Sequence, residues 1–338
     1  MLVAGSGPMD PHGQGDDLAD AAMSAAERGD MPETERLARR ALVLAERVAD
    51  GSRRDALCAR ALRPLGTAQR ARGQYHEAEQ TFRRALASAS VGFGPESLEV
   101  AELHNDLGMT YKYVGRFPEA DDAYGRARAI LEALPGTDPE DLAALFHNLG
   151  GLAHARGDFE AAEPLARRAI EIRSQALGER APATLLDRSA HAAILFGLGR
   201  VDEAETSIRD LLGDLEAALG IDHPEVAVAL NNLAAILQAR GELTEAEALF
   251  RRVIAIRESQ LGEDAPLLAV PLNNLATVLE RQGQVGDAAA LYDRAAQLLE
   301  SSVDDEHPNL VAVRRNAARL GAYRPTTPLT SDSASHDS

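Results

Sequence analysis

Apolar residues recur at spacings of three and four along almost the whole chain, with polar residues between them. The stretch from His223 to Ala265 shows the pattern most clearly. The apolar positions of its first half are Val226, Leu230, Leu233, Ala234 and Leu237, and those of its second half are Ala246, Leu249, Phe250 and Val253. Each set would form one face of a helix. Gly241 between them suits a tight turn, because glycine adopts the left-handed conformation at little cost.

The two-helix pattern repeats every 42 residues. One register consists of Gly73, Gly115, Gly157, Gly199, Gly241 and Gly283, and another of Ala78, Ala120, Ala162, Ala204, Ala246 and Ala288. A looser copy around Gly29 precedes them, and residues 307–320 predict a final first helix without a second. A fixed period of this length is typical of a solenoid. The sequence therefore predicts an all-α array of about seven helix pairs and a C-terminal capping helix.

Small residues share one position of each predicted first helix. They are Gly66, Gly108, Gly150, Ala192, Ala234 and Ala276. A position that stays small in every copy would let the two helices of a pair approach closely.

These motifs resemble the tetratricopeptide repeat, a helix–turn–helix unit. The 42-residue period, the sequence L-N-N-L-A in the first helix, E-A-E in the second and an L-G-x-D/E-x-P exit are similar to its kinesin-light-chain-like subtype. The resemblance implies a right-handed α-solenoid over residues 17–321. Composition predicts disordered tails on both sides, a Gly/Pro/Asp-rich one over 1–16 and an acidic Ser/Thr-rich one over 322–338.

The charge and cysteine content narrow the classes of partner and compartment. A net charge of −18 and a pI of about 4.9 disfavour general nucleic-acid binding and attachment to an anionic membrane. Cys58 is the single cysteine, so no disulfide can form within the chain. The N-terminal residues lack the pattern of a signal peptide, and no apolar stretch is long enough to span a bilayer. We expect a soluble, cytoplasmic protein.

The resemblance also implies that the first helices line a concave groove that holds the ligand. Two adjacent positions before the central Leu would face this groove or lie at its edge. They are Arg63-Pro64, Asn105-Asp106, His147-Asn148, Ser189-Ala190, Asn231-Asn232 and Asn273-Asn274. An Asn amide donates and accepts hydrogen bonds, so a row of them could hold the main chain of an extended peptide. Alternatively, one Asn of each pair only ties its helix to a neighbour.

A second column of groove positions changes from basic to acidic along the array. It contains Arg70, Lys112, His154, Phe196, Gln238 and Glu280. This gradient could set the direction of a bound peptide, or it could be neutral variation on a solvated face. The candidate peptide-binding residues are Asn105, Lys112, His147, Asn148, His154, Asn231, Asn232, Gln238, Asn273 and Asn274.

The predicted second helices carry Glu four residues before Arg, which is the favourable order for a pair on a helix surface. The pairs are Glu79–Arg83, Glu163–Arg167, Glu205–Arg209 and Glu247–Arg251. A column of further arginines runs beside them. We interpret this side as a solvated convex face rather than a phosphate-binding stripe.

The middle repeats depart most from the pattern. His191 replaces the central Leu, and Asp187 precedes it by one helical turn. His147 and His154 share a face of the preceding first helix. This spacing could serve a metal or an acid–base pair, but known metal-binding and catalytic signatures are missing. The ordinary interpretation is that Asp187 accepts a hydrogen bond from His191.

Our leading hypothesis is a non-enzymatic scaffold that binds a peptide or a helix of another cytoplasmic protein, without a cofactor. A second hypothesis is a sensor or regulatory subunit that acts in trans on another enzyme. A third is an unorthodox enzyme or metal site built from His147, His154, Asp187 and His191. The superhelix could also associate with a second copy of itself.

Overall fold

The computed structural model describes residues 11–305 and 307–320, and all regular structure in these ranges is helical. The helices are α1 (Pro11–Glu27), α2 (Met31–Ala45), α3 (Gly51–Ala71), α4 (Tyr75–Gly92), α5 (Leu98–Tyr113), α6 (Phe117–Ala133), α7 (Pro139–Ala155), α8 (Phe159–Leu177), α9 (Pro182–Gly197), α10 (Val201–Leu219), α11 (Pro224–Arg240), α12 (Leu243–Leu261), η1 (Pro266–Leu268, a 3₁₀ helix), α13 (Ala269–Arg281), α14 (Val285–Glu300) and α15 (Pro308–Arg319). The predicted all-α solenoid is confirmed.

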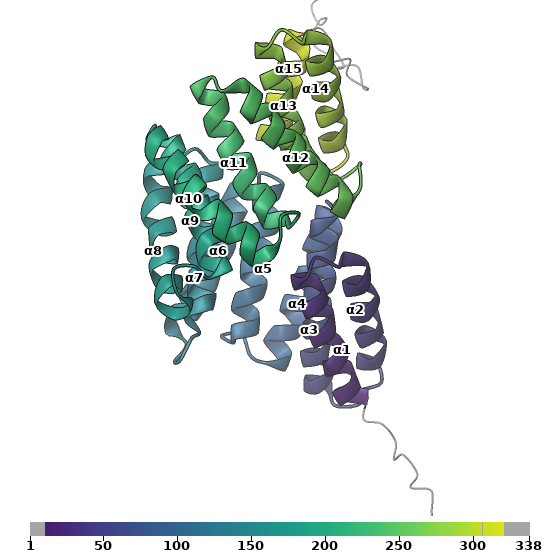
Figure 1. The fold of residues 1–338 in the computed structure, drawn as a ribbon. Helices are drawn as coiled ribbons and strands as arrows, with labels where there is room; N and C mark the ends of the chain where they lie inside the picture. The colour runs from purple at the N-terminus through teal and green to yellow at the C-terminus, as the bar shows by residue number, and fades with distance from the viewer. Residues whose placement is uncertain (1–10, 306, 321–338) are drawn as a thin grey trace, which may run out of the picture.

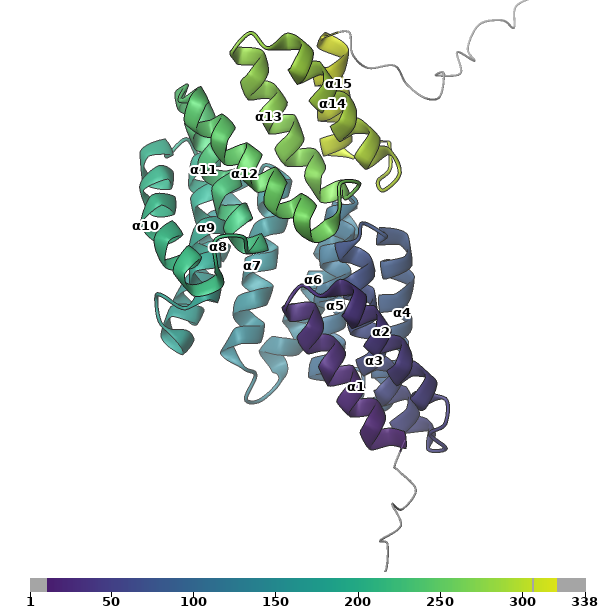
Figure 2. The same cartoon turned by 45° about the vertical axis from the view of Figure 1, so that its right-hand side comes forward.

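Consecutive helices form antiparallel pairs that stack side by side into a curved array (Figures 1 and 2). Odd-numbered helices up to α13 are the first helices of the pairs, and α15 packs on α14. The array starts earlier than expected, because α1 begins at Pro11 and takes in part of the tail predicted for residues 1–16. The rest of that tail, and the tail predicted for 322–338, lie outside the described residues.

The turns inside the pairs follow from the repeated glycine. Gly241 ends α11 with φ of 87° and ψ of 8°, and its N–H donates to the carbonyl oxygen of Gln238 at 3.2 Å. A side chain would strain this left-handed conformation. Its counterparts also have positive φ, and they are Gly29, Gly73, Gly115, Gly157, Gly199 and Gly283. The glycine register seen in the sequence is therefore a register of identical turns.

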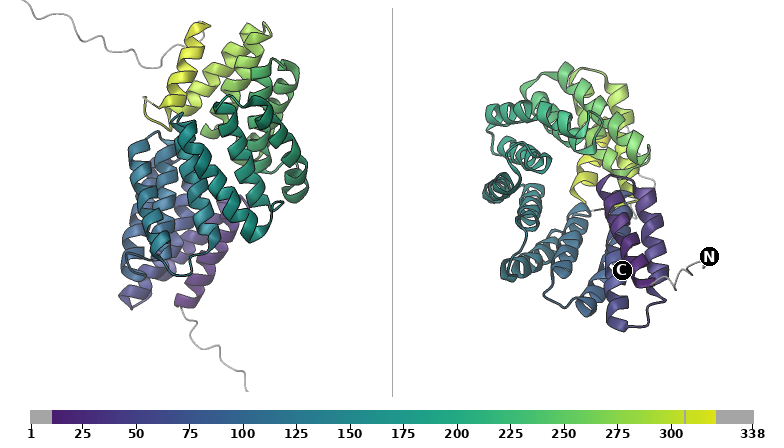
Figure 3. Two further views of the ribbon diagram at one scale, coloured as in Figure 1. Left: turned by 90° about the vertical axis from the view of Figure 1, so that its left-hand side faces the viewer. Right: turned by 60° about the horizontal axis from the view of Figure 1, so that its bottom comes forward.

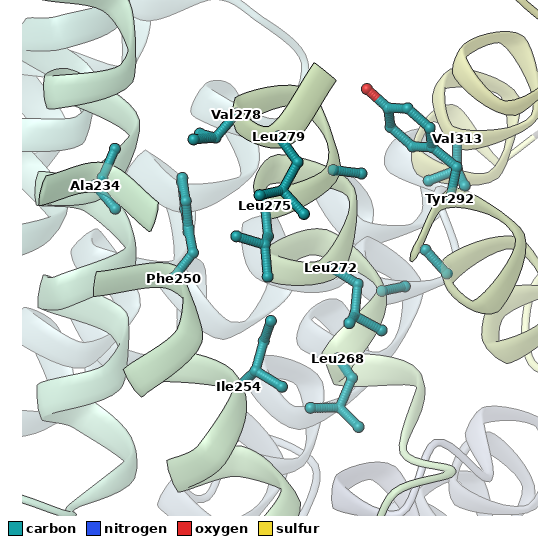
Figure 4. Packing of buried hydrophobic residues seen from close by; sticks show 14 of the residues in the cluster. Ala234, Phe250, Ile254, Leu268, Leu272, Leu275, Val278, Leu279, Tyr292 and Val313 are labelled. Carbon is teal, nitrogen blue, oxygen red and sulfur yellow. The ribbon is translucent and has the colours of Figure 1, made fainter. Parts of the chain in front are cut away.

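In the α3–α4 and α5–α6 pairs, the small position of the first helix faces an aromatic ring of the second helix. A methyl group added at Gly66 would lie 2.7 Å from the Phe82 ring, and one at Gly108 would lie 2.5 Å from the Tyr124 ring. In Figure 4, Phe250 lies between Ala234 of α11 and the core residues of α13. The predicted close approach of the paired helices is confirmed, and glycine or alanine is required where a ring covers the first helix.

The outer face is salt-bridged as predicted. The four pairs Glu79–Arg83, Glu163–Arg167, Glu205–Arg209 and Glu247–Arg251 form, with N–O distances of 2.5 to 2.9 Å. Their arginine side chains stay 42 to 59% exposed, so each pair contributes little to stability. No helix in the described ranges is both long and apolar enough to cross a membrane.

Candidate ligand-binding channel

The two halves of the array meet across the superhelix. The His307 imidazole Nε2 lies 3.0 Å from the carbonyl oxygen of Tyr113. At a second contact, Pro266 packs so closely on Gly73 that a Cβ there would be 2.6 Å from the proline ring. The curved array therefore closes into a ring, which Figure 3 shows end-on in its right-hand view.

A cavity of about 800 Å³ lies where the halves meet. Residues of the α1–α2, α3–α4 and α5–α6 turns line one side, and residues of α11, α12, η1 and the α14–α15 loop line the other. Tyr75 and Tyr113 stack in its wall with ring centroids 5.8 Å apart. The cavity is large enough for a segment of peptide, since ligand pockets in proteins span roughly 300 to 1,000 Å³.

Two cations beside this cavity have no carboxylate within ion-pair distance among the described residues. Burial, together with the nearby charge of Arg70, lowers the pKa of Lys112 to about 8. Burial also lowers the pKa of Arg257, which lines the cavity, and its Nε has no hydrogen-bond partner. The Lys112 Nζ lies 5.6 Å from the centre of the Tyr113 ring. Both side chains are partly buried. A partly buried cation without a partner is costly, and an anionic ligand would relieve that cost.

Most of the candidate asparagines tie first helices to one another. The Asn148 amide donates to Asn105 Oδ1 at 2.9 Å, and Asn232 donates to the Ser189 carbonyl oxygen at 3.4 Å. At the end of the array, Asn316 donates to Asn273 Oδ1 at 2.9 Å. The second Asn of a pair thus reaches back to the preceding repeat. This geometry corresponds to the alternative in which one Asn row only holds neighbouring helices together.

Asn231 differs from the others, because its buried Oδ1 has no hydrogen-bond partner and the residue lines the large cavity. Asn274, one repeat later, accepts a 3.5 Å bond from Asn273 instead of donating to Asn231. Gln238 is half-buried on α11, and its carbonyl oxygen accepts from Arg281. Asn231 is therefore the asparagine with an acceptor left over for a ligand.

The basic-to-acidic column is paired at its ends and open in its middle. Arg70 donates to Asp106 at 3.2 Å, and Glu280 pairs with Arg319. Lys112 and His154, in the middle of the column, have no such ion pair among the described residues. Desolvation and the charge of Lys112 lower the pKa of His154. The His154 ring makes an edge contact with Phe159 at 5.4 Å between centroids.

The middle-repeat cluster is arranged differently from the prediction. Asp187 is fully buried, and it pairs with His147 Nδ1 and with Arg173, both at 2.7 Å. His191 instead lies 3.5 Å from Glu163 of α8. The predicted hydrogen bond between Asp187 and His191 was therefore wrong, because the Asp187 carboxylate pairs with Arg173 of α8 and His147 of α7 instead. Within the described ranges, no three His, Cys, Asp or Glu side chains are grouped to hold a metal.

The sequence pattern did not single out Arg257, Tyr75 or Tyr113 as site residues. A signal for Arg257 was present: the repeat period places it in a column with Leu131, Leu215 and Leu299, which are buried or nearly so. Arg173 occupies the same column and pairs with Asp187. An arginine at an apolar position needs a partner, and Arg257 has none among the described residues.

A family model described as tetratricopeptide repeat matches residues 57–133, 141–212, 188–259 and 225–301, and a second model of that description matches 105–176. No curated protein matches the chain.

Several solved structures are similar. NprR in complex with its cognate peptide NprX is 13% identical with a TM-score of 0.63, over 94% of this chain and 84% of that one. A Rap protein complexed with Competence and Sporulation Factor is 13% identical with a TM-score of 0.57, over 91% and 98%. A putative kinesin light chain repeat protein from Podosopora anserina is 25% identical with a TM-score of 0.43, over 54% and 87%. The likeness to NprR and to the Rap protein is one of fold.

Proposed function

Because the chain belongs to the tetratricopeptide repeat family, whose model matches more than half of it, we propose that it binds a peptide segment of another protein inside the closed superhelix. The observation that carries the proposal is the cavity of about 800 Å³ in which Asn231 Oδ1 and Arg257 Nε have no partner. An extended main chain offers N–H groups to Asn231 and oxygens to Arg257. A ligand of this kind would satisfy both groups.

The unpaired cations favour a peptide that carries a carboxylate. The Lys112 Nζ lies over the Tyr113 ring, and Tyr113 and Arg257 both line the cavity. Three candidate residues of the first helices remain: His147, His154 and Gln238. They would contact the ligand along the channel, by which we mean the interior of the closed superhelix. The fold shared with NprR, whose structure contains its cognate peptide, supports peptide binding.

Selection from a library of random peptides displayed on phage tests the proposal. The wild-type protein should enrich peptides that contain Asp or Glu, and a Lys112→Ala/Arg257→Ala variant should lose them. Arg251→Ala is the matched control, because this exposed arginine lies on the outer face and pairs only with Glu247 among the described residues. Equal enrichment by the channel variant and the wild type would reject the channel as the binding site.

The contact between the two halves of the array favours a second function, that of a regulatory subunit whose shape responds to its ligand. A ligand that enters the cavity touches both halves, so binding would favour the closed ring. Small-angle scattering with and without a selected peptide would measure this change. An unchanged radius of gyration would leave the passive scaffold as the function.

We also propose the kinesin-light-chain-like subtype and a cytoplasmic location. The subtype is supported by the 42-residue period and the L-N-N-L-A sequence of α11. The location is supported by Cys58, which is a free thiol.

A further inference from the structure

One repeat breaks the rule that a large residue of the second helix covers the small position of the first. The large residues at this position are Phe82, Tyr124, Ile208, Phe250 and Tyr292. In the α7–α8 pair the corresponding residue is Ala166, and it faces Gly150. A methyl group added at Gly150 would lie 3.4 Å from the backbone nitrogen of Ala166, an ordinary contact, and it would meet no ring.

A pocket of about 180 Å³ lies at this place. Its walls come from small residues of α7, α8 and α9, namely Gly150, Gly151, Ala166, Ala169, Ala190 and Ala193. Ile194 of α9 and Val228 of α11 complete the apolar lining. Apolar cavities of roughly 150 Å³ stay dry and bind benzene, so this pocket has the size for one aromatic ring.

Polar side chains complete the lining of the pocket. They are His147, His154, Asp187 and Asn232, and all four come from first helices. The Lys112 Nζ lies 3.2 Å from the Cβ position of Gly151, which lines the pocket. Lys112 also lies over Tyr113, which lines the large cavity, so its ammonium group is close to a lining residue of both the pocket and the cavity. A ligand whose carboxylate reached Lys112 would carry neighbouring side chains to the pocket.

We propose that this pocket binds one aromatic side chain of the channel ligand. The ring takes the place that Phe82, Tyr124, Phe250 and Tyr292 fill from within the chain in other repeats. The inference rests on the proposed peptide binding and adds its specificity: a Phe or Tyr near an acidic group. Aromatic anchors in closed pockets dominate binding energy, so this side chain would decide which peptides bind.

The test fills the pocket with the residue that the other repeats use. Ala166→Phe restores the consensus ring, and Ala193→Leu fills the pocket from the opposite wall. Ala161→Phe is the matched control, because it adds the same ring on the exposed side of α8. Thermal unfolding followed by circular dichroism shows that each variant folds. The two probes are p-cresol, detected by saturation-transfer NMR on the full chain, and acidic peptides with and without a Phe, selected on the wild type.

We expect p-cresol to bind the wild type and Ala161→Phe, and binding to be lost in both filled variants. Selected peptides should contain a Phe or Tyr and should bind Ala166→Phe at least about tenfold more weakly. Peptides that bind Ala166→Phe and the wild type equally would overturn the pocket and leave peptide binding intact. If no peptide is selected but p-cresol binding is lost on filling, the aromatic pocket stands and the proposed function fails.

Discussion

The His307 imidazole joins the C-terminal helix α15 to the carbonyl oxygen of Tyr113, 194 residues earlier in the chain. Its Nδ1 accepts from the N–H of Asn309 at 3.1 Å and so caps α15. Nε2 therefore carries the proton that is donated to Tyr113 at 3.0 Å. Because Nδ1 accepts and Nε2 donates, the two bonds require a neutral imidazole. The His307 side chain thus both caps the last helix and holds the superhelix closed.

Closure of the ring should depend on pH. Burial lowers the pKa of His307 below its ordinary 6.5, although the bond to Tyr113 and the charge of Asp304 act in the opposite direction. When the superhelix opens, the His307 imidazole is exposed and can take up a proton. The stabilisation of the closed form by neutral His307 is therefore fully present above pH 6.5, and it is lost as the pH falls through the lowered pKa. We expect the radius of gyration from small-angle scattering to increase between pH 7.5 and 5.5.

His307→Asn provides the control for this prediction. Asn still caps the helix but does not titrate in this range. The variant should therefore show a smaller pH response than the wild type. The same expansion in both proteins would assign the response to other histidines.

The last helix should stabilise the whole C-terminal end. Leu310, Val313 and Ala317 of α15 are buried against α13 and α14, whose apolar faces would otherwise meet water. Removal of residues 307–338 should lower the melting temperature or solubility far more than removal of 325–338. Equal melting temperatures for the two truncations would contradict the capping role.

The sequence was sufficient for the helix pairs because their cause is local. Gly241 and its counterparts mark the turns, and Ala234 marks a site where a ring crosses the first helix. These contacts form within one repeat, so the residues that make them recur in each copy of the repeat. The sequence period therefore predicted the elements and their pairing.

The closure and most of the cavity could not be predicted in the same way. The contact between His307 and Tyr113 depends on the small rotation from each repeat to the next, summed over the array. No single repeat encodes that sum. The asparagines show a related limit, since the same L-N-N-L sequence leaves Asn231 with an open acceptor and Asn273 with a bond to Asn316. Which role an asparagine takes depends on the neighbouring repeat.

The two kinds of asparagine should respond differently to replacement. Asn148→Ala removes a nearly buried bond to Asn105 and should lower the free energy of unfolding by about 1 to 2 kcal/mol. Asn231→Ala removes an acceptor that has no partner, so stability should change little, while peptide affinity falls. Chemical denaturation and binding titrations of both variants measure this. A greater loss of stability for Asn231→Ala would exclude a ligand-binding role.

Asp187 should be a structural residue rather than part of a catalytic or metal site. Its side chain is fully buried between Arg173 and His147, and Arg173 is itself only 11% exposed. Asp187→Ala leaves the guanidinium without its nearest carboxylate and should destabilise the protein by about 3 to 5 kcal/mol. His147→Ala should cost much less, because that ring is 35% exposed. Equal effects of the two substitutions, measured by denaturation, would contradict this assignment.

Phe250→Ala should turn a filled repeat into a copy of the open one. The Phe250 ring is fully buried and packs with Ala234 in the core that α11 and α13 share (Figure 4). Its removal should lower the free energy of unfolding by about 3 to 5 kcal/mol. In the α7–α8 pair, where Ala166 stands naturally, small residues line a pocket of about 180 Å³ instead. The new space in Phe250→Ala should bind p-cresol and regain stability on binding. A variant that loses less than about 1 kcal/mol and binds no p-cresol would show that the repeat collapses around the gap, and that the pocket at Ala166 depends on more than the absence of a ring.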